Sequence, residues 1–349
     1  MRAALWNTVA QLEAVGPDHI AIVRRALTRL EPSQVRVRVR AASLNHRDLL
    51  VIRGHFADQL RLPLVPLSDC AGEVVEIGAD VKRFKIGDRV AAAPMPKWVT
   101  GPFSSPMLAS ALGGAADGVL GEYFSCDQRA VVAISDWLSF EEAATLPCAA
   151  LTAWNALFEQ NDLKPGQTLL VQGSGGVSIF ALQFAVAAGA RVIATSCSDL
   201  KLERLRELGA THVVNYRRMP DWSRTVLELT NGAGVDHVIE TGGAGTLDQS
   251  IKATAVGGCI SVIGVLTGAT GTFDTLPILK KMLRLQGIVV GSVEMFERMV
   301  GTMENLDITP VIDRTFDMQD IAAALKYLES GRHIGKVVVR VSGSAACTR

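Results

Sequence analysis

Residues 171–178 read Val171-Gln172-Gly173-Ser174-Gly175-Gly176-Val177-Ser178. They follow a short apolar run, Thr168 to Gln172, and precede an apolar segment with the length of a helix, Val177 to Ala188. Gly173 permits a tight turn and Gly175 lets a pyrophosphate approach the backbone, while a helix start offers amide groups and a positive dipole end. In this context the glycine motif predicts a dinucleotide-binding strand–turn–helix unit.

Apolar runs and helical segments continue to alternate on the C-terminal side of this turn. Continuous apolar strands separated by helices are typical of a parallel sheet that is covered on both faces. We therefore predict a Rossmann doubly wound domain over residues 151–292. Its predicted strands are Thr168–Gln172, Arg191–Thr195, His212–Asn215, Val235–Glu240, Cys259–Gly264 and Leu285–Val290.

Residues 1–150 have a different texture, with short β-segments interrupted by glycine and proline. Such a pattern is typical of an irregular β-barrel or sandwich. Residues 293–349 carry two helical and two strand-like segments and are expected to return to this first domain. The predicted fold class is α/β, with a β-rich domain formed by residues 1–150 and 293–349 beside the Rossmann domain.

The composition excludes several functional classes. Lys+Arg and Asp+Glu both number 35, so charge gives no reason to expect nucleic acid as a partner. No apolar stretch is long enough to predict a membrane span, and the segment Met1 to Trp6 lacks the apolar region of a secretory signal. The six cysteines are scattered without a CxxC pair, as expected of reduced thiols. We expect a cytoplasmic protein that binds neither nucleic acid nor membrane.

Several further stretches resemble the medium-chain dehydrogenase/reductases, most closely their quinone-oxidoreductase-like branch. They occur in the order of that family over nearly the whole chain. The resemblance implies a GroES-like catalytic domain in the β-rich part, a Rossmann domain, an active site in the cleft between them, and a homodimer. The stretches are Asn45-His46-Arg47-Asp48-Leu49, Cys70 to Gly78, Phe84 to Val90, Ala143 to Pro147, Leu151 to Trp154 and Gly335-Lys336-Val337-Val338.

The end of the second Rossmann strand indicates which cofactor is bound. An NAD site requires an acid there to accept the ribose hydroxyls. Residues 194–198 contain no acid, and Asp199 falls in the next turn. A 2′-phosphate instead favours hydroxyls and a cation, which Ser196, Ser198 and Lys201 supply and which Tyr216 can join. Capping of the next helix by Ser198 or Asp199 is an alternative and is compatible with this role. NADP(H) is therefore expected in preference to NAD(H).

Other cofactor contacts are expected from backbone at strand ends, because open α/β sheets bind ligands at the carboxyl ends of their strands. The segments at Thr241, Gly264 and Gly291 have an ordinary strand-ending turn as their alternative, and the glycine turn at Gly173 has a turn that binds nothing. His46 or Arg47 is expected to pair with the pyrophosphate. The predicted backbone contacts are Gly173, Ser174, Gly175, Gly176, Val177, Thr241, Gly264, Val265, Gly291 and Ser292.

The resemblance also indicates where zinc-dependent relatives hold their metal. Asn45, Ser68 and Cys148 stand at the three corresponding positions. Zinc requires three ligands drawn from Cys, His and Asp or Glu, and one thiol with the nearby carboxylate of Asp69 is a poor set. Residues 91–125 contain no cysteine, so the structural zinc lobe is also missing. We predict no zinc.

Without a metal, hydrogen-bond donors must stabilise the oxyanion that develops during hydride transfer. Asn45 is expected to donate to a substrate carbonyl and Thr152 to face the nicotinamide, while Asp48 and Asp69 orient neighbours or relay a proton. The apolar side chains between Ala93 and Gly121 favour a small apolar carbonyl, enone, quinone or alcohol. Two alternatives stay open: a zinc-dependent alcohol dehydrogenase with a degenerate site, and a nucleotide-binding protein without turnover.

Overall fold

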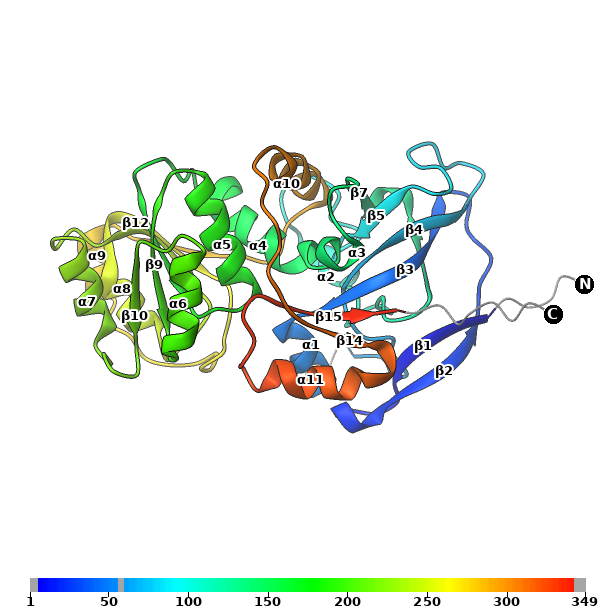
Figure 1. Cartoon of the computed structure of the whole chain (residues 1–349), viewed down its shortest axis with the longest axis horizontal. Helices are drawn as coiled ribbons and strands as arrows, with labels where there is room; N and C mark the ends of the chain where they lie inside the picture. The colour runs from blue at the N-terminus through cyan, green and yellow to red at the C-terminus, as the bar shows by residue number, and fades with distance from the viewer. Residues whose placement is uncertain (1–5, 56–59, 342–349) are drawn as a thin grey trace, which may run out of the picture. The chain divides into compact units, whose positions relative to one another are not determined.

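The computed structural model describes residues 6–55 and 60–341 (Figure 1). Residues 1–5, on which the expected absence of a secretory signal rests, lie outside the described residues. The chain divides into two compact units, Met1–Leu151 with Gly291–Arg349 and Thr152–Val290. In the described ranges, no helix has the length and apolar character needed to cross a bilayer.

The second unit is built on a parallel six-stranded sheet in the order β10-β9-β8-β11-β12-β13. Helices α5 and α6 cover one face, and α7, α8 and α9 cover the other (Figure 1). The prediction of a doubly wound α/β domain is thereby confirmed. Its elements are β8 (Thr168–Gln172), α5 (Gly176–Ala187), β9 (Arg191–Ser196), α6 (Asp199–Glu207), β10 (His212–Asn215), α7 (Trp222–Leu229), β11 (Val235–Glu240), α8 (Leu247–Ala253), β12 (Thr254–Val262), α9 (Leu276–Lys281) and β13 (Arg284–Gly287).

Burial on both faces explains why the central strands have continuous apolar sequences. Every residue of β8 is buried, and Leu170 packs in a core cluster with Val238 and Ile260 of the neighbouring strands β11 and β12. The last strand is shorter than predicted: β13 ends at Gly287, not at Val290. The backbone enters the left-handed region at Val290, where φ is 45°, so extended pairing does not continue to that residue.

The first unit is built on a seven-stranded sheet with the long strand β3 in its middle. β3 pairs with β4 along one edge and with β6 and β15 along the other, and β15 comes from the C-terminal part of the chain. A separate hairpin is formed by β1 and β2. The strands are β1 (Trp6–Leu12), β2 (Ile20–Ala26), β3 (Gln34–Leu44), β4 (Asp69–Ile77), β5 (Arg89–Ala92), β6 (Tyr123–Asp127), β7 (Val131–Ala133), β14 (Ile312–Asp317) and β15 (Lys336–Arg340).

Short helices surround this sheet and close its core. Val35, Val37 and Val39 alternate inward along β3 and join a cluster that includes Ile321 and Leu325 of α11. The helices of this unit are α1 (His46–Ile52), α2 (Ser105–Leu108), α3 (Phe140–Ala143), a π-helical turn (Leu146–Ala150), α10 (Val293–Asn305) and α11 (Ile321–Glu329). The chain passes into the second unit through α4 (Leu151–Trp154) and a second π-helical turn (Asn155–Glu159).

Candidate functional site

Asn45 lies at the point where β3 ends and α1 begins. Its backbone N–H donates to Oδ2 of Asp48 at 2.8 Å, and Arg47 contacts the other carboxylate oxygen at 3.2 Å. Asp48 is buried, and burial raises its pKa to about 6 although the Arg47 guanidinium favours the charged form. The observed contacts of Asp48 are therefore those of a helix-capping residue. A role of Asp48 in relaying a proton stays a prediction.

Lys336 contributes a buried ammonium group to the same region of the first unit. It is the first residue of β15, opposite the end of β3, and only 2% of its surface is exposed. Nζ donates to the carbonyl oxygen of Leu44 at 2.7 Å and to Oδ1 of Asn45 at 2.6 Å. In the sequence, Lys336 stands out only as part of the motif Gly335-Lys336-Val337-Val338. The available signal was a lysine directly before the apolar run Val337 to Val339.

Asp69 completes this cluster from the start of β4. It has no exposed surface, and the backbone just before it is left-handed at Leu67, where φ is 69°. The Ser68 hydroxyl donates to Oδ1 at 2.6 Å, and the backbone N–H of Cys148 donates to Oδ2 at 3.1 Å. Nζ of Lys336 lies 3.9 Å from Oδ2. The structure thus gathers Asn45, Asp48, Asp69 and the positions 68 and 148 in one buried polar cluster.

The chemistry of this cluster does not fit a zinc ion. Burial and the Asp69 charge raise the pKa of the Cys148 thiol to about 12 in the metal-free protein. Ser68 and Asn45 at the other two corresponding positions are not zinc ligands. Oδ1 of Asn45 already accepts a bond from the Lys336 ammonium, which would repel a second cation. Within the described part of the chain, no group of three or more His, Cys, Asp or Glu side chains is arranged to hold a metal ion.

The predicted glycine turn begins the phosphate-binding part of the second unit. Gly173 has φ 75°, and an added Cβ at Gly173 or Gly175 would meet no atom within 4 Å. Gly175 is the N-cap of α5 and provides no side-chain cap, so the open space faces backbone amides. Ser174 is buried beside the turn, and Gly176 and Val177 form the start of the helix. This arrangement fits a dinucleotide pyrophosphate.

A hydrogen-bond network of uncharged donors around one carboxylate supports the strand ends next to that turn. The buried Glu240 carboxylate, at the end of β11, accepts from Gln172 Nε2 at 2.7 Å and from the N–H groups of Gly242 and Gly243. Thr241 donates its hydroxyl to the Gln172 carbonyl at 3.1 Å. Gly264 lies so close to Thr241 that an added Cβ would come within 2.4 Å of the Thr241 carbonyl. Val265, the next residue, is exposed.

The expected 2′-phosphate residues lie at the carboxyl ends of β9 and β10. Ser196 ends β9, Ser198 is the N-cap of α6, and Lys201 lies in its first turn. Tyr216 follows β10 and is partly exposed. Desolvation and a hydrogen bond with Cys197 raise its pKa to about 12, so its hydroxyl keeps its proton at neutral pH.

The one nearby acid in the turn after β9, Asp199, is already engaged. It accepts from Asn215 Nδ2 at 2.7 Å and forms an ion pair with Arg218. Arg218 was missed by the sequence analysis, although the pair Arg217-Arg218 directly after the third strand is a visible basic signal. The ion pair places an arginine cation beside the Asp199 carboxylate at this strand end.

The remaining predicted residues lie elsewhere. His46 is exposed at the start of α1, and Gly291 and Ser292 belong to the first unit. The Ser292 hydroxyl accepts from the Met295 N–H at 3.2 Å and so caps α10. Thr152 is buried in α4 and is counted with the second unit. Their roles toward cofactor and substrate stay predictions.

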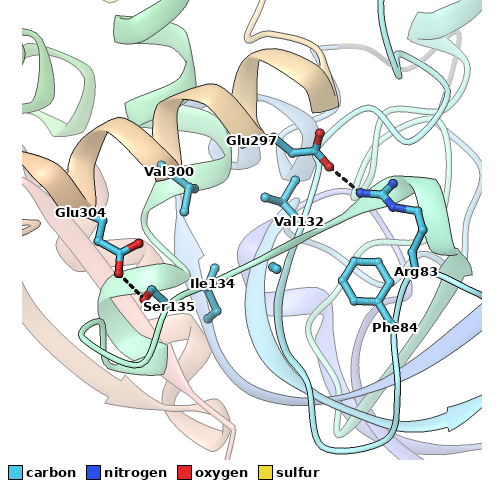
Figure 2. A pocket seen from close by; sticks show the side chains of 10 residues that line it. Arg83, Phe84, Val132, Ile134, Ser135, Glu297, Val300 and Glu304 are labelled. Carbon is cyan, nitrogen blue, oxygen red and sulfur yellow. Dashed lines mark hydrogen bonds and ion pairs between the residues drawn. The ribbon is translucent and has the colours of Figure 1, made fainter.

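A pocket of about 460 Å³ in the first unit lies between α10 and β7, and its lining contains none of the predicted site residues. Figure 2 shows Arg83 reaching Glu297 and Ser135 reaching Glu304, with apolar side chains between these two pairs. Its polar groups are thus engaged with one another, and the pocket does not mark the chemical centre.

Comparison with known proteins agrees with this architecture. Residues 31–136 match the alcohol dehydrogenase GroES-like domain, and residues 176–305 match the zinc-binding dehydrogenase family. A zinc-type alcohol dehydrogenase-like protein of Schizosaccharomyces pombe is 43% identical over 98% of this chain and 99% of its own length.

Two solved structures extend the comparison. A Sinorhizobium meliloti protein solved as a candidate alcohol dehydrogenase is 41% identical with a TM-score of 0.91, covering 97% of this chain and 100% of its own. An NAD-dependent alcohol dehydrogenase is 34% identical with a TM-score of 0.89, covering 96% and 100%. The chain is therefore an oxidoreductase of the medium-chain dehydrogenase/reductase superfamily, with a GroES-like domain and a Rossmann-type nucleotide-binding domain.

Proposed function

We propose that the protein is an NADPH-dependent oxidoreductase that transfers hydride to or from a small apolar carbonyl, enone, quinone or alcohol without catalytic zinc. The observation that carries this proposal is the buried ammonium of Lys336, which is bonded to Asn45 and lies 3.9 Å from Asp69. An ammonium in this position supplies positive charge next to the residues that correspond to zinc ligands, and it disfavours a metal ion there.

Asn45 is the proposed contact for the substrate oxygen. Its Nδ2 atom is a buried donor that finds no acceptor among the residues that the structure describes. Bound NADPH supplies the hydride. Hydride addition to a carbonyl carbon leaves negative charge on the oxygen, and an oriented N–H donor stabilises that charge most in the transition state. Solvent can supply the proton that completes an alcohol product.

The preference for NADPH is supported by the charges around β9 and β10. Ser196, Ser198 and Tyr216 offer hydroxyl groups, and Lys201 adds a cation. Asp199 forms an ion pair with Arg218, so the acid that follows β9 is already bonded to a cation.

The apolar substrate class is supported by the segment between β5 and β6 in the first unit. Trp98 is buried and packs edge-on against Phe103, with ring centroids 4.9 Å apart. Phe103 and Leu108 are 37% and 39% exposed, so the segment offers apolar surface to a ligand. This surface favours apolar substrates without choosing among them.

A metal analysis combined with a cofactor and substrate screen tests the proposal. Protein purified without chelators is expected to contain no stoichiometric zinc, to bind NADPH more tightly than NADH, and to oxidise NADPH with at least one quinone, enone or aldehyde. Stoichiometric zinc whose removal abolishes activity would favour the zinc-dependent alternative. Tight NADPH binding with no turnover on any substrate would favour the non-enzyme.

We also propose a cytoplasmic homodimer. The five cysteines that lie in the described residues are all free thiols, as in a reducing compartment. β13 is the terminal strand of the parallel sheet, and Leu279, Met282 and Leu285 around it are exposed. An apolar sheet edge favours pairing with a second copy. Light scattering of the intact protein is expected to give twice the chain mass, and replacing Leu279 and Met282 by Glu should lower it.

A further inference from the structure

We propose that Lys336 is a positioning residue that holds the Asn45 amide so that its Nδ2 faces the substrate oxygen, and that its charge strengthens this donor. The inference deepens the proposed function and rests on it. Its basis is a chain of contacts in the first unit: an ammonium on an amide oxygen, and an amide nitrogen of the same side chain left as a buried donor.

The chemistry of an ammonium fixes the orientation of the amide. Lysine has donors only, so the Asn45 atom that lies 2.6 Å from Nζ must be the oxygen. Nζ is itself fixed by its second bond, to the Leu44 carbonyl at 2.7 Å. The Asn45 amide therefore cannot turn over without placing NH₂ against an ammonium.

The remaining half of the amide points to a ligand. Asn45 is 9% exposed, and its Nδ2 atom meets no acceptor in the described part of the chain. An unpaired buried N–H group costs roughly 1–3 kcal/mol, so a site that keeps one is prepared for an acceptor that arrives later. A carbonyl oxygen is such an acceptor, and an oxygen that gains negative charge is a better one.

Lys336 acts on this donor through polarisation. A cation on the amide oxygen draws electron density from the nitrogen, and bonds in such a chain strengthen one another. Asp69 does not compete for the ammonium at bonding distance, because 3.9 Å separates Nζ from Oδ2 and the carboxylate is held by Ser68 and Cys148. Asp69 thus balances the charge of Lys336 and leaves its bond to Asn45 intact.

The test is a double-mutant cycle of Lys336→Met and Asn45→Ala, with Lys336→Arg as the conservative variant. Lys336→Met should lower kcat about 30-fold, with little change in the NADPH dissociation constant, because the lost stabilisation belongs to the transition state. In the Asn45→Ala background, Lys336→Met should lower kcat at most about threefold, since Lys336 acts through Asn45. Lys336→Arg should recover part of kcat. Equal losses in both backgrounds, or a loss only in NADPH affinity, overturn the inference.

A second readout does not depend on turnover. The side-chain NH₂ resonance of Asn45, assigned by its loss in Asn45→Ala, should shift in Lys336→Met protein without cofactor, and an unchanged resonance contradicts the inference. Lys281→Met is the control, because the Lys281 ammonium likewise donates to protein oxygens, here three backbone carbonyls, but belongs to the second unit and bonds no residue of this cluster. It should lower the melting temperature and leave kcat unchanged.

The same cycle separates the inference from the proposed function. If Asn45→Ala loses activity and Lys336→Met does not, the oxidoreductase proposal stands and the role of Lys336 is wrong. If Lys336→Met does not fold, Lys336→Arg still tests the inference, because it keeps the charge and should retain the coupling to Asn45. If none of the tested carbonyls and quinones supports NADPH oxidation by the wild-type protein, the proposed function itself fails.

Discussion

The two units bury a carboxylate in contrasting ways. Asp69 in the first unit and Glu240 in the second both have no exposed surface. Glu240 accepts from five neutral donors, namely Gln172, Gly242, Gly243, Thr246 and Ser250. Asp69 accepts from two, and its charge is balanced by an ammonium whose own bonds go to other atoms. A carboxylate saturated by neutral donors stabilises a fold, whereas the cluster around Asp69 leaves one buried donor, Asn45 Nδ2, without an acceptor in the described part of the chain.

The largest effect is expected when that buried donor, Asn45 Nδ2, is removed from the cluster around Asp69. Asn45→Ala should lower kcat by about 100-fold, close to the cost of removing one oxyanion donor, with NADPH affinity almost unchanged. Steady-state kinetics and a cofactor titration give both values. Thr8→Ala, in the distant strand β1, serves as a control that should keep kcat. An unchanged kcat in Asn45→Ala would remove Asn45 from the reaction.

Breaking the hydrogen-bond network around Glu240 should lower the stability of the fold. Glu240→Gln places an NH₂ group among donors and should lower the free energy of unfolding by about 3 kcal/mol, because bonds to a buried carboxylate are replaced by unmatched groups. Chemical denaturation measures the change. The exposed pair of Glu228 with Arg224 provides the control, since Glu228→Gln should cost less than about 0.5 kcal/mol. Similar losses in both variants would mean that the network adds nothing to stability.

The pH dependence of stability tests a third buried carboxyl group, that of Asp48 in the first unit. Burial raises the pKa of this carboxyl from an ordinary value near 3.8 to about 6, with Asp69 also raising it and Arg47 and Lys336 opposing. The folded protein therefore binds the proton more tightly than the unfolded chain does. Wild-type protein should gain stability relative to Asp48→Asn as the pH falls from about 7 to about 4, by roughly 2 kcal/mol. Denaturation at both pH values checks this, and a gap that widens as the pH rises contradicts it.

The smallest effect is expected on cofactor binding at Lys201, in the first turn of α6 in the second unit. Lys201→Ala should weaken NADPH binding by roughly 1.5–3 kcal/mol and NADH binding much less, because only NADPH carries the 2′-phosphate. Parallel titrations with the two cofactors measure the difference. Lys164→Ala is the control, since this exposed lysine pairs with Asp162 outside the predicted site. Equal weakening of NADPH and NADH would refute the assigned specificity.

Local patterns explain how much of this molecule the sequence could predict. The turn at Gly173 and the strands Thr168–Gln172, His212–Asn215 and Val235–Glu240 have the predicted bounds, because apolar runs and glycine act over a few residues. The end of β13 was misjudged, since a left-handed Val290 has no sequence signature. The bond between Lys336 and Asn45 spans 291 positions and depends on the pairing of β15 with β3. No local pattern carries such information, so the central cation of the cluster emerged only from the structure.

That pairing also has a consequence for biosynthesis. A ribosome that has completed β3 and Asn45 must add 291 further residues before the ammonium can reach its partner. Until then the nascent first unit lacks both the strand that extends its sheet and the cation that balances Asp69. Contacts of such long range form late and slow folding. The cluster around Lys336 and Asn45 is therefore expected to form only after the entire nucleotide-binding unit has been translated, so an incomplete chain should lack the proposed active site.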